Sequence, residues 1–356
     1  MAKVRVLVVD DSLTVRRQLC AALAQDKDIE IAGEAVDGKQ AIQLCRELRP
    51  DVITLDMMLP VMSGLATTEY VMAHFPTPIL IVSSSNNRGA AFKMFDALTA
   101  GAVDVLEKPT GDEAEGEWER KFVSTVKLVS RIRVITHPRG RLGGLARVPS
   151  ERTQLPEAAL SRAYRIVAIG VSTGGPSAIG LVLRTLQLQL PIPVLVVLHL
   201  GEQFGGSFAG WLETQVPHRV SYARDGEPAY SIGGRVVLAP PGRHLVVRGG
   251  RLRLTSDPER HSCRPSVDVL FESLASEYGE ATLACLLTGM GRDGAGGLLE
   301  IRKAGGCTIA QDEATSIVYG MPREAVLLGA AERVLPLGEI GPAIAELLAR
   351  KHGSGR

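Results

Sequence analysis

A serine near the middle of the chain follows a pattern that could present it as a nucleophile. Residues 164–175 read Y-R-I-V-A-I-G-V-S-T-G-G, an apolar run that meets a glycine shortly before Ser172. This pattern predicts a buried strand over residues 165–169 that turns into a helix over residues 177–186. Pro176 suits the first helical position because no N–H donor is needed there. The free N–H groups of such a helix end stabilise developing negative charge. The G-x-S-x-G spacing is that of serine hydrolases, although a glycine-rich turn without chemistry is the simpler alternative.

Two more apolar runs end in residues that could assist this serine. Pro193–Leu198 runs into His199, and Thr282–Leu287 precedes T-G-M-G-R-D-G, which contains Asp293. Continuous apolar runs are typical of parallel strands buried on both faces, and the ends of such strands share one edge of the sheet. We therefore expect Ser172, His199 and Asp293 to meet in a crevice as nucleophile, general base and orienting carboxylate.

Other interpretations remain open at this point. By position alone, His244 and His261 are also candidates for the base. The chain order of serine, histidine and aspartate differs from the orders in chymotrypsin, subtilisin and the α/β-hydrolases. A dinucleotide-binding turn would need G-x-G-x-x-G, which this glycine-rich stretch lacks. A non-catalytic binding output domain is disfavoured, because no basic recognition helix follows residue 164.

The first 109 residues carry a second set of chemical groups, one at the end of nearly every predicted strand. Apolar strands alternate with helical patterns, which predicts a doubly wound parallel sheet whose strand ends meet at one edge. The residues at those ends are Asp10, Asp11, Asp56, Ser83 and Lys108. Crowded carboxylates repel one another unless a hard cation neutralises them, and Mg²⁺ prefers oxygen ligands. One carboxylate could then attack a phosphoryl donor, with the Lys108 and Ser83 side chains holding the transferred oxygens.

On these residues, the region up to about residue 130 resembles a response-regulator receiver domain. The M-L-P-V-M-S-G-L segment of residues 58–65 resembles the loop that follows the family's phosphoacceptor. The resemblance implies phosphotransfer from a histidine kinase to Asp56. It also implies Mg²⁺ held by Asp11, Asp56 and the backbone carbonyl of Met58, with Asp10 completing the acidic pair. Val103 and Val105 are the nearest candidates for the family's aromatic switch residue, so that feature departs from the pattern.

The second half resembles the catalytic domain of the chemotaxis protein-glutamate methylesterase (CheB) family. The matching stretches are I-G-V-S-T-G-G-P (169–176), L-A-P-P-G-R-H-L (238–245), R-P-S-V-D-V-L-F (264–271), T-G-M-G-R-D-G-A-G-G-L (288–298) and A-Q-D-E-A-T-S-I-V-Y-G-M-P (310–322). With a receiver in front, the resemblance spans nearly the whole chain.

This resemblance implies a role for each residue of the site. Ser172 is the expected nucleophile, His199 the base and Asp293 its orienting carboxylate, while the Met290 N–H is the oxyanion donor and Thr173 lines the site. The reaction implied is hydrolysis of γ-glutamyl methyl esters on chemoreceptors, with glutamine deamidation as a second activity and no cofactor for the esterase step. Residues 198–201 read L-H-L-G where the family usually has Q-H-M-P, which bears on substrate preference.

Domain order suggests how such an enzyme would be controlled. We expect a receiver over residues 1–135, an Arg-, Gly- and Pro-rich flexible linker over 136–163, and a Rossmann-like catalytic domain over 164–350. Apolar residues at helical spacing predict a last receiver helix over about 117–134. In the family, the unphosphorylated receiver covers the esterase site and phosphorylation relieves the block.

The composition bears on the number of domains, the binding partners and the cellular location. A chain of 356 residues suits two domains, and its 40 basic and 39 acidic residues nearly cancel, which does not favour nucleic acid or an anionic membrane as partner. The five scattered cysteines form no C-x-x-C pair and predict neither disulfides nor a zinc motif. No signal peptide and no transmembrane run are recognisable, so we expect a cytoplasmic protein without membrane insertion.

Overall fold

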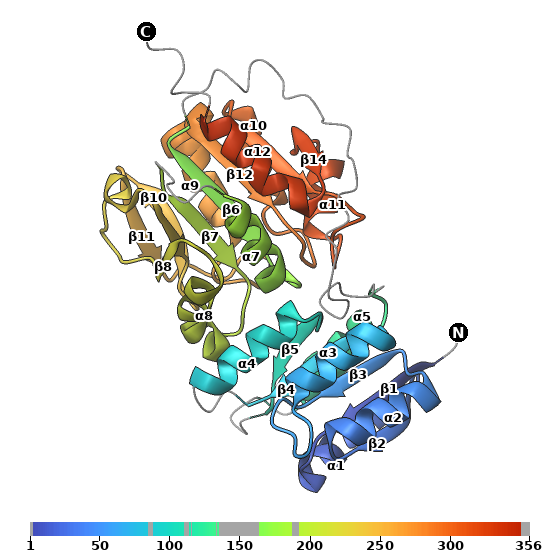
Figure 1. Cartoon of the computed structure of the whole chain (residues 1–356). Coiled ribbons are helices and arrows are strands. Elements are labelled where there is room, and N and C mark those ends of the chain that lie inside the picture. Colours follow the sequence, from blue (N-terminus) through green and yellow to red (C-terminus); the bar gives the residue numbers. More distant parts are fainter. Residues whose placement is uncertain are drawn as a thin grey trace. The chain divides into compact units, whose positions relative to one another are not determined.

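The chain forms two compact units, each with its own β-sheet. The computed structural model describes residues 3–84, 88–109, 114, 116–132, 134, 164–186 and 192–349. The units are Met1–Arg147 and Val148–Arg356 (Figure 1). The predicted linker, residues 136–163, lies outside the described residues.

The N-terminal unit is a five-stranded parallel sheet in the order β2-β1-β3-β4-β5, which is the flavodoxin-like order. Its strands are β1 (Val4–Val9), β2 (Ile29–Ala35), β3 (Val52–Leu55), β4 (Ile79–Ser83) and β5 (Asp104–Glu107). The chain reverses direction across the sheet between β1 and β3. Ligand sites of open α/β sheets lie at such a point, beyond the carboxyl ends of the strands.

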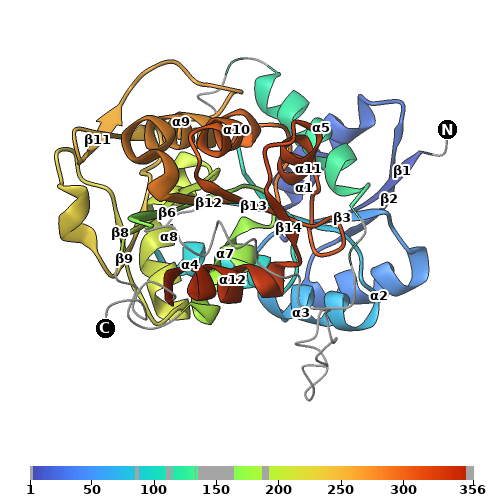
Figure 2. The same ribbon diagram turned by 90° about the horizontal axis from the view of Figure 1, so that it is seen from above.

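Five helices cover the two faces of this sheet. They are α1 (Leu13–Ala24), α2 (Gly38–Leu48), α3 (Gly64–His74), α4 (Arg88–Thr99) and α5 (Glu117–Val129). Helices α1 and α5 pack together on one face, and α2 and α3 pack together on the other (Figure 2). Side chains of Ser12, Asp37 and Ser63 cap the first three helices by accepting a backbone N–H. The last receiver helix ends at Val129, earlier than predicted, because the chain tightens into a turn at Ser130.

The C-terminal unit is a seven-stranded parallel sheet in the order β14-β13-β12-β6-β7-β9-β8. Its strands are β6 (Ile166–Val171), β7 (Val194–Leu198), β8 (Arg219–Tyr222), β9 (Arg235–Leu238), β12 (Thr282–Leu286), β13 (Cys307–Gln311) and β14 (Arg333–Leu335). Here the reversal of strand order lies between β6 and β12. The prediction of two doubly wound α/β domains is confirmed.

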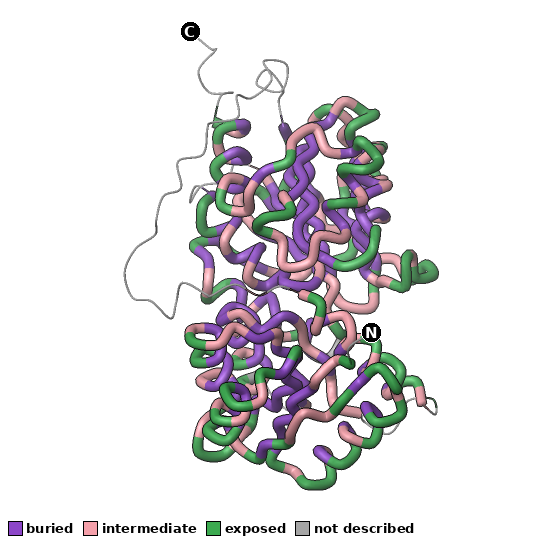
Figure 3. Tube along the Cα trace, turned by 90° about the vertical axis from the view of Figure 1, so that its right-hand side faces the viewer, coloured by how far each residue is buried: buried purple, intermediate pink, exposed green. Residues whose placement is uncertain are grey.

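Helices cover both faces of the second sheet as well. They are α7 (Gly175–Thr185), α8 (Glu202–Gln215), α9 (Val267–Tyr278), α10 (Ala295–Lys303), α11 (Met321–Leu327) and α12 (Leu337–Ala349), with short 3₁₀ turns η2 (Ala229–Ile232) and η3 (Gly279–Ala281). Helices α9 and α10 lie on one face, and α7 and α12 on the other (Figure 2). In each unit the buried strands run through the middle and exposed segments lie outside (Figure 3).

An antiparallel hairpin lies outside the parallel sheet and was not predicted. It consists of β10 (His244–Arg248) and β11 (Arg251–Thr255), joined by Gly249 and Gly250 at positive φ. One side of the hairpin packs on α9 and joins the hydrophobic core through Leu245, Val247 and Leu252.

Gly170 corrects one expectation about the serine loop. The sequence predicted that β6 would stop before this glycine, but the strand continues to Val171. A Cβ on Gly170 would lie 2.2 Å from Cγ1 of Val267, so the glycine lets α9 pack closely on the strand. The sharp turn is made further along, at Gly174, whose φ is +77°.

Candidate active site and acidic receiver site

Ser172 and His199 are brought together by neighbouring strands. Ser172 is the first residue after β6, and His199 is the first after β7. The His199 backbone N–H donates to the carbonyl of Val171 at 3.1 Å, which extends the pairing of the two strands to this edge. The Gly175 N–H donates to the Ser172 carbonyl at 2.7 Å and closes the turn into α7. Both side chains are partly exposed.

Asp293 contacts His199 from the loop after β12, on the other side of β6. Its Oδ2 lies 2.9 Å from His199 Nε2. The same carboxylate accepts hydrogen bonds from Ser266 Oγ (2.7 Å), the Val267 N–H (2.7 Å) and the Asp268 N–H (3.1 Å). These last groups form the N-terminus of α9, where the helix dipole favours a negative charge. The carboxylate is therefore fixed from several directions.

The two partners shift each other's protonation. Burial raises the pKa of Asp293, but the hydrogen bonds from His199, Ser266 and Val267 outweigh burial and lower it overall. Burial lowers the pKa of His199, but the hydrogen bond to Asp293 and the neighbouring Cys263 sulfur together raise it to about 9. The pair of protonated His199 and ionised Asp293 is thus favoured around neutral pH.

The second imidazole nitrogen faces a cysteine. His199 Nδ1 lies 3.7 Å from Cys263 Sγ, and that sulfur also lies 3.4 Å from the His261 carbonyl. Among the described residues, no hydrogen bond joins Ser172 Oγ to His199. The structure therefore brings together the predicted base and carboxylate directly and places the serine beside them. Catalytic hydrogen bonds often tighten only once substrate is bound.

The loop after β12 also approaches the serine. The Ser172 N–H donates to the Thr288 carbonyl at 3.0 Å. A Cβ on Gly289 would lie only 2.7 Å from the Ser172 Cβ, so this loop needs a glycine to come so close. Met290, the next residue, is exposed, and its backbone N–H has no hydrogen-bond partner among the described residues. Thr173 is buried, and its carbonyl accepts from Thr288 Oγ1 at 3.0 Å.

The two alternative bases have other partners. His244 is fully buried, with Nε2 3.1 Å from the Pro258 carbonyl and Nδ1 accepting the Ser266 N–H at 3.1 Å. These contacts occupy both nitrogens of a neutral ring. His261 Nε2 lies 3.0 Å from Asp268 Oδ2. Of the three histidines, His199 is the one whose ring is hydrogen-bonded to Asp293.

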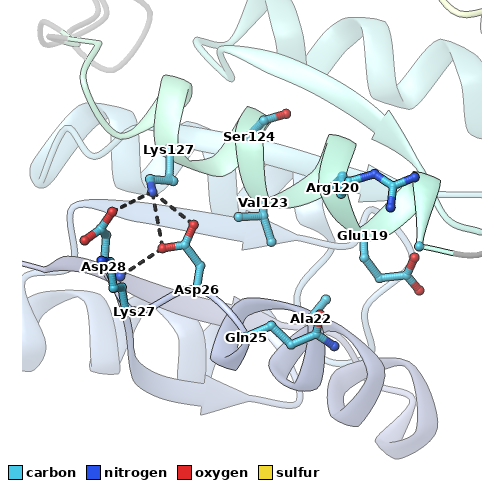
Figure 4. A pocket seen from close by; sticks show the side chains of 11 residues that line it. Ala22, Gln25, Asp26, Lys27, Asp28, Glu119, Arg120, Val123, Ser124 and Lys127 are labelled. Atoms are coloured by element: carbon cyan, nitrogen blue, oxygen red, sulfur yellow. Dashed lines mark hydrogen bonds and ion pairs between the residues drawn. The ribbon is translucent and has the colours of Figure 1, made fainter.

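Of two cavities, one adjoins the predicted site of the C-terminal unit and the other lies in the receiver. One of about 510 Å³ is lined by the loop of Met290 to Asp293 together with His261, Cys263 and Glu324, and so adjoins the predicted site. A larger one, of about 990 Å³, lies between α1 and α5 of the receiver (Figure 4). Lys127 there is paired with Asp26 and Asp28 at 3.0 Å. This larger cavity holds none of the predicted site residues.

In the receiver, the predicted acidic residues converge at the edge of the sheet. Asp10 and Asp56 are buried and Asp11 is exposed, with carboxylate oxygens within 4.8 Å of one another. Lys108 Nζ lies 2.7 Å from Asp10 Oδ2 and 2.8 Å from Asp56 Oδ2. Ser83 Oγ donates to Asp56 Oδ1 at 3.1 Å, so all five predicted residues meet here.

The charges of this cluster suit a divalent cation. Burial raises the pKa of Asp10, and Lys108 opposes that shift. Burial lowers the pKa of Lys108, but the hydrogen bonds to Asp10 and Asp56 outweigh it and raise the pKa overall. Three carboxylates face one ammonium group, so the ionised cluster carries two uncompensated negative charges. An all-oxygen donor set of this charge fits Mg²⁺.

Sequence reasoning missed three residues that contact the predicted site or its loops. Ser266 was recognised only as part of a motif, yet its hydroxyl positions Asp293 and caps α9. Gln311 is fully buried, and its Oε1 accepts the Thr288 N–H at 2.8 Å. The sequence around Cys263 shows no motif that would indicate a role for this residue. A serine just before an amphipathic helical run was the available signal for Ser266.

Together, the folds and sites define a two-domain protein, with a phosphoacceptor-type receiver in front of an α/β domain that carries a serine, histidine and aspartate at its strand switch point. Models of known families agree with this division. Residues 6–115 match the response regulator receiver domain, and residues 167–344 match the CheB methylesterase domain. The chain belongs to the CheB family of receiver-linked methylesterases.

Curated relatives cover nearly the entire chain. A protein-glutamate methylesterase/protein-glutamine glutaminase of Anaeromyxobacter dehalogenans is 44% identical over 97% of this chain and 97% of its own. A protein of the same name from Nocardioides is 41% identical over 99% of this chain and 98% of its own. The crystal structure of the Thermotoga maritima CheB methylesterase catalytic domain is 35% identical, covers 52% of this chain and 100% of its own, and has a TM-score of 0.49. Within the described residues, no helix is long and apolar enough to span a bilayer.

Proposed function

We propose that this protein hydrolyses γ-glutamyl methyl esters on chemoreceptors, and deamidates receptor glutamines, under control of receiver phosphorylation. The names of its relatives, protein-glutamate methylesterase/protein-glutamine glutaminase, support glutamate methyl esters and glutamines of proteins as substrates. The observation that carries the proposal is the position of Ser172 beside the hydrogen-bonded pair of His199 and Asp293 at the switch point of the sheet.

In the proposed reaction, neutral His199 takes the proton of the Ser172 hydroxyl as its oxygen attacks the ester carbonyl. The Met290 N–H stabilises the oxyanion, Thr173 lines the site, and Asp293 holds the imidazolium in place. His199 then protonates the leaving group, so that methanol departs, or ammonia in the case of a glutamine. Water activated by the same base releases the glutamate carboxylate and restores the serine.

In the receiver, Asp56 is the proposed phosphoacceptor and a histidine kinase its phosphodonor. Asp10, Asp11, Asp56 and the Met58 carbonyl would hold Mg²⁺, which neutralises charge on the phosphoryl group. Lys108 and Ser83 contact Asp56 and would bind phosphoryl oxygens once it is phosphorylated. The receiver is proposed to restrain the esterase domain until Asp56 is phosphorylated.

The decisive experiment measures methanol release from methylated receptor membranes, with and without a small phosphodonor plus Mg²⁺. Release should rise with phosphodonor in the wild type and vanish in Ser172→Ala, whereas Ser177→Ala, a change on the following helix, should retain it. Undiminished release from Ser172→Ala would overturn the assignment of the nucleophile. No release from phosphorylated wild type would overturn the substrate assignment.

The receiver's role needs its own comparison. Asp56→Asn should remove the response to phosphodonor, while Asp51→Asn, a change at an exposed residue just before β3, should retain it. Removal of residues 1–135 should raise methanol release in the absence of phosphodonor. An unchanged rate after that removal would argue against restraint by the receiver.

A further inference from the structure

We propose that Cys263 and His199 form a zinc-binding site that blocks the base of the esterase. Their donor atoms, Cys263 Sγ and His199 Nδ1, are 3.7 Å apart. Cys263 precedes α9 and His199 follows β7, so the pair is created by the fold and leaves no spacing motif in the sequence.

The separation of the two atoms fits a shared tetrahedral ion. Zinc binds sulfur at about 2.3 Å and imidazole nitrogen at about 2.0–2.1 Å, and a tetrahedral angle then places the two donors about 3.6 Å apart. A thiolate and an imidazole are also the ligands that zinc prefers over hard cations. Little rearrangement is therefore needed for both atoms to bind one ion.

Asp293 completes the arrangement on the far side of the ring. Histidine ligands of zinc commonly hydrogen-bond a carboxylate through the other ring nitrogen, which fixes the ring and strengthens the ligand. His199 Nε2 makes this contact with Asp293 Oδ2 at 2.9 Å. Asp293 accepts three further hydrogen bonds, so we assign it this supporting role and not that of a ligand.

The site is accessible to an ion and to water. The cavity of about 510 Å³ is lined by Cys263, Asp293 and Met290, and so reaches one of the two proposed ligands. The other ligand, His199, is partly exposed. Water would fill the remaining positions around zinc. Glu324 and Arg292 also line this cavity and bring charges of opposite sign to it. Two protein ligands would give reversible binding, because structural zinc sites normally use four.

Zinc binding has a direct chemical consequence. The Zn–S bond forms as the thiol proton leaves to solvent, and the Zn–N bond forms with the Nδ1 lone pair after the second imidazolium proton has also left to solvent. That lone pair is the one His199 has left for accepting a proton while Nε2 is bonded to Asp293. Binding itself is independent of the reaction, whereas inhibition of methanol release rests on the proposed function.

Cobalt(II) is the probe for binding, because a Co²⁺–thiolate bond absorbs light and Zn²⁺ does not. Titration of the full-length wild type with Co²⁺ should produce a sulfur-to-cobalt charge-transfer band that stoichiometric Zn²⁺ removes. Cys263→Ser should lack the band, and Cys20→Ser, which alters a partly buried thiol of the receiver, should retain it. The carboxylates of the receiver supply oxygen only and cannot produce this band.

Inhibition is measured as methanol release relative to each variant's own zinc-free rate. The Zn²⁺ concentration that halves the rate should rise at least tenfold in Cys263→Ser and stay unchanged in Cys20→Ser. In the wild type, Zn²⁺ should also slow alkylation of Cys263 by iodoacetamide, a test that needs no variant. A missing Co²⁺ band in the wild type, a band that persists in Cys263→Ser, or unprotected Cys263 would each overturn the zinc site.

Discussion

Replacing Asp293 by asparagine tests how the carboxylate controls the base. Each of its oxygens accepts two hydrogen bonds: Oδ2 from His199 and the Val267 N–H, and Oδ1 from Ser266 and the Asp268 N–H. An asparagine keeps one oxygen and must turn an NH₂ group toward two donors. In either orientation it loses the negative charge that stabilises the imidazolium.

The magnitude follows from these contacts. A hydrogen bond to a charged group contributes roughly 1.5–3 kcal/mol, and each 1.4 kcal/mol corresponds to about tenfold in rate. Loss of the preferred tautomer adds to this effect, so we expect kcat/KM for methyl ester hydrolysis to fall about 10²- to 10⁴-fold in Asp293→Asn.

The pH profile provides the sharper test. His199 must be neutral to accept a proton, and its pKa is raised to about 9. Wild-type kcat/KM should therefore rise about tenfold per pH unit from neutrality and level off above about pH 9. In Asp293→Asn the inflection should move down, because burial lowers the pKa of His199 and the strongest opposing interaction is gone.

The assay is methanol release from methylated receptor membranes across about pH 6 to pH 10, at constant ionic strength. Asp225→Asn is the matched control, since that carboxylate is exposed and accepts a backbone N–H from Leu254, away from the site. The reasoning fails if Asp293→Asn keeps wild-type kcat/KM, or if its inflection stays at about 9 while the rate falls.

Three further outcomes are expected. Ser266→Ala removes the cap of α9 and one hydrogen-bond donor to the Asp293 carboxylate. It should therefore lower the free energy of unfolding by about 1 kcal/mol in urea denaturation and reduce esterase kcat about tenfold. An unchanged kcat would contradict a role of Ser266 in positioning Asp293. Gly170→Ala should destabilise the catalytic domain by about 1–3 kcal/mol, because the added Cβ would clash with Val267. Gly206→Ala should not destabilise it, because the space around Gly206 is open. Equal denaturation midpoints for the two variants would contradict this reasoning. Burial lowers the pKa of His218, so the unfolded state binds more protons and the free energy of unfolding should fall as pH drops below about 6.5. Between about pH 7 and pH 5, the free energy of unfolding should fall less steeply in His218→Gln than in the wild type. An identical fall in the two proteins would exclude this histidine as the cause.

The sequence by itself determined the elements and most of the chemical groups. Apolar runs such as Val4–Val9 and Val194–Leu198 are local signals of buried parallel strands, and the residues that follow such strands meet at one edge. The five receiver residues and the neighbourhood of Ser172, His199 and Asp293 were predictable for this reason. Motif resemblance then assigned roles that spacing alone left open between several histidines.

Tertiary structure decided how those groups are held. Which histidine contacts Asp293 depends on the order of strands in the sheet, since β7 and β12 lie on opposite sides of β6. The N-terminus of α9, with Ser266, reaches the carboxylate from 25 to 27 residues away, and the hydrogen bonds between them carry no sequence period. Cys263 beside His199, and Gly170 beneath Val267, are likewise contacts between distant segments. The raised pKa of His199 and the close packing of Gly170 on Val267 arise only in the folded chain, because folding brings these residues together and excludes water from between them.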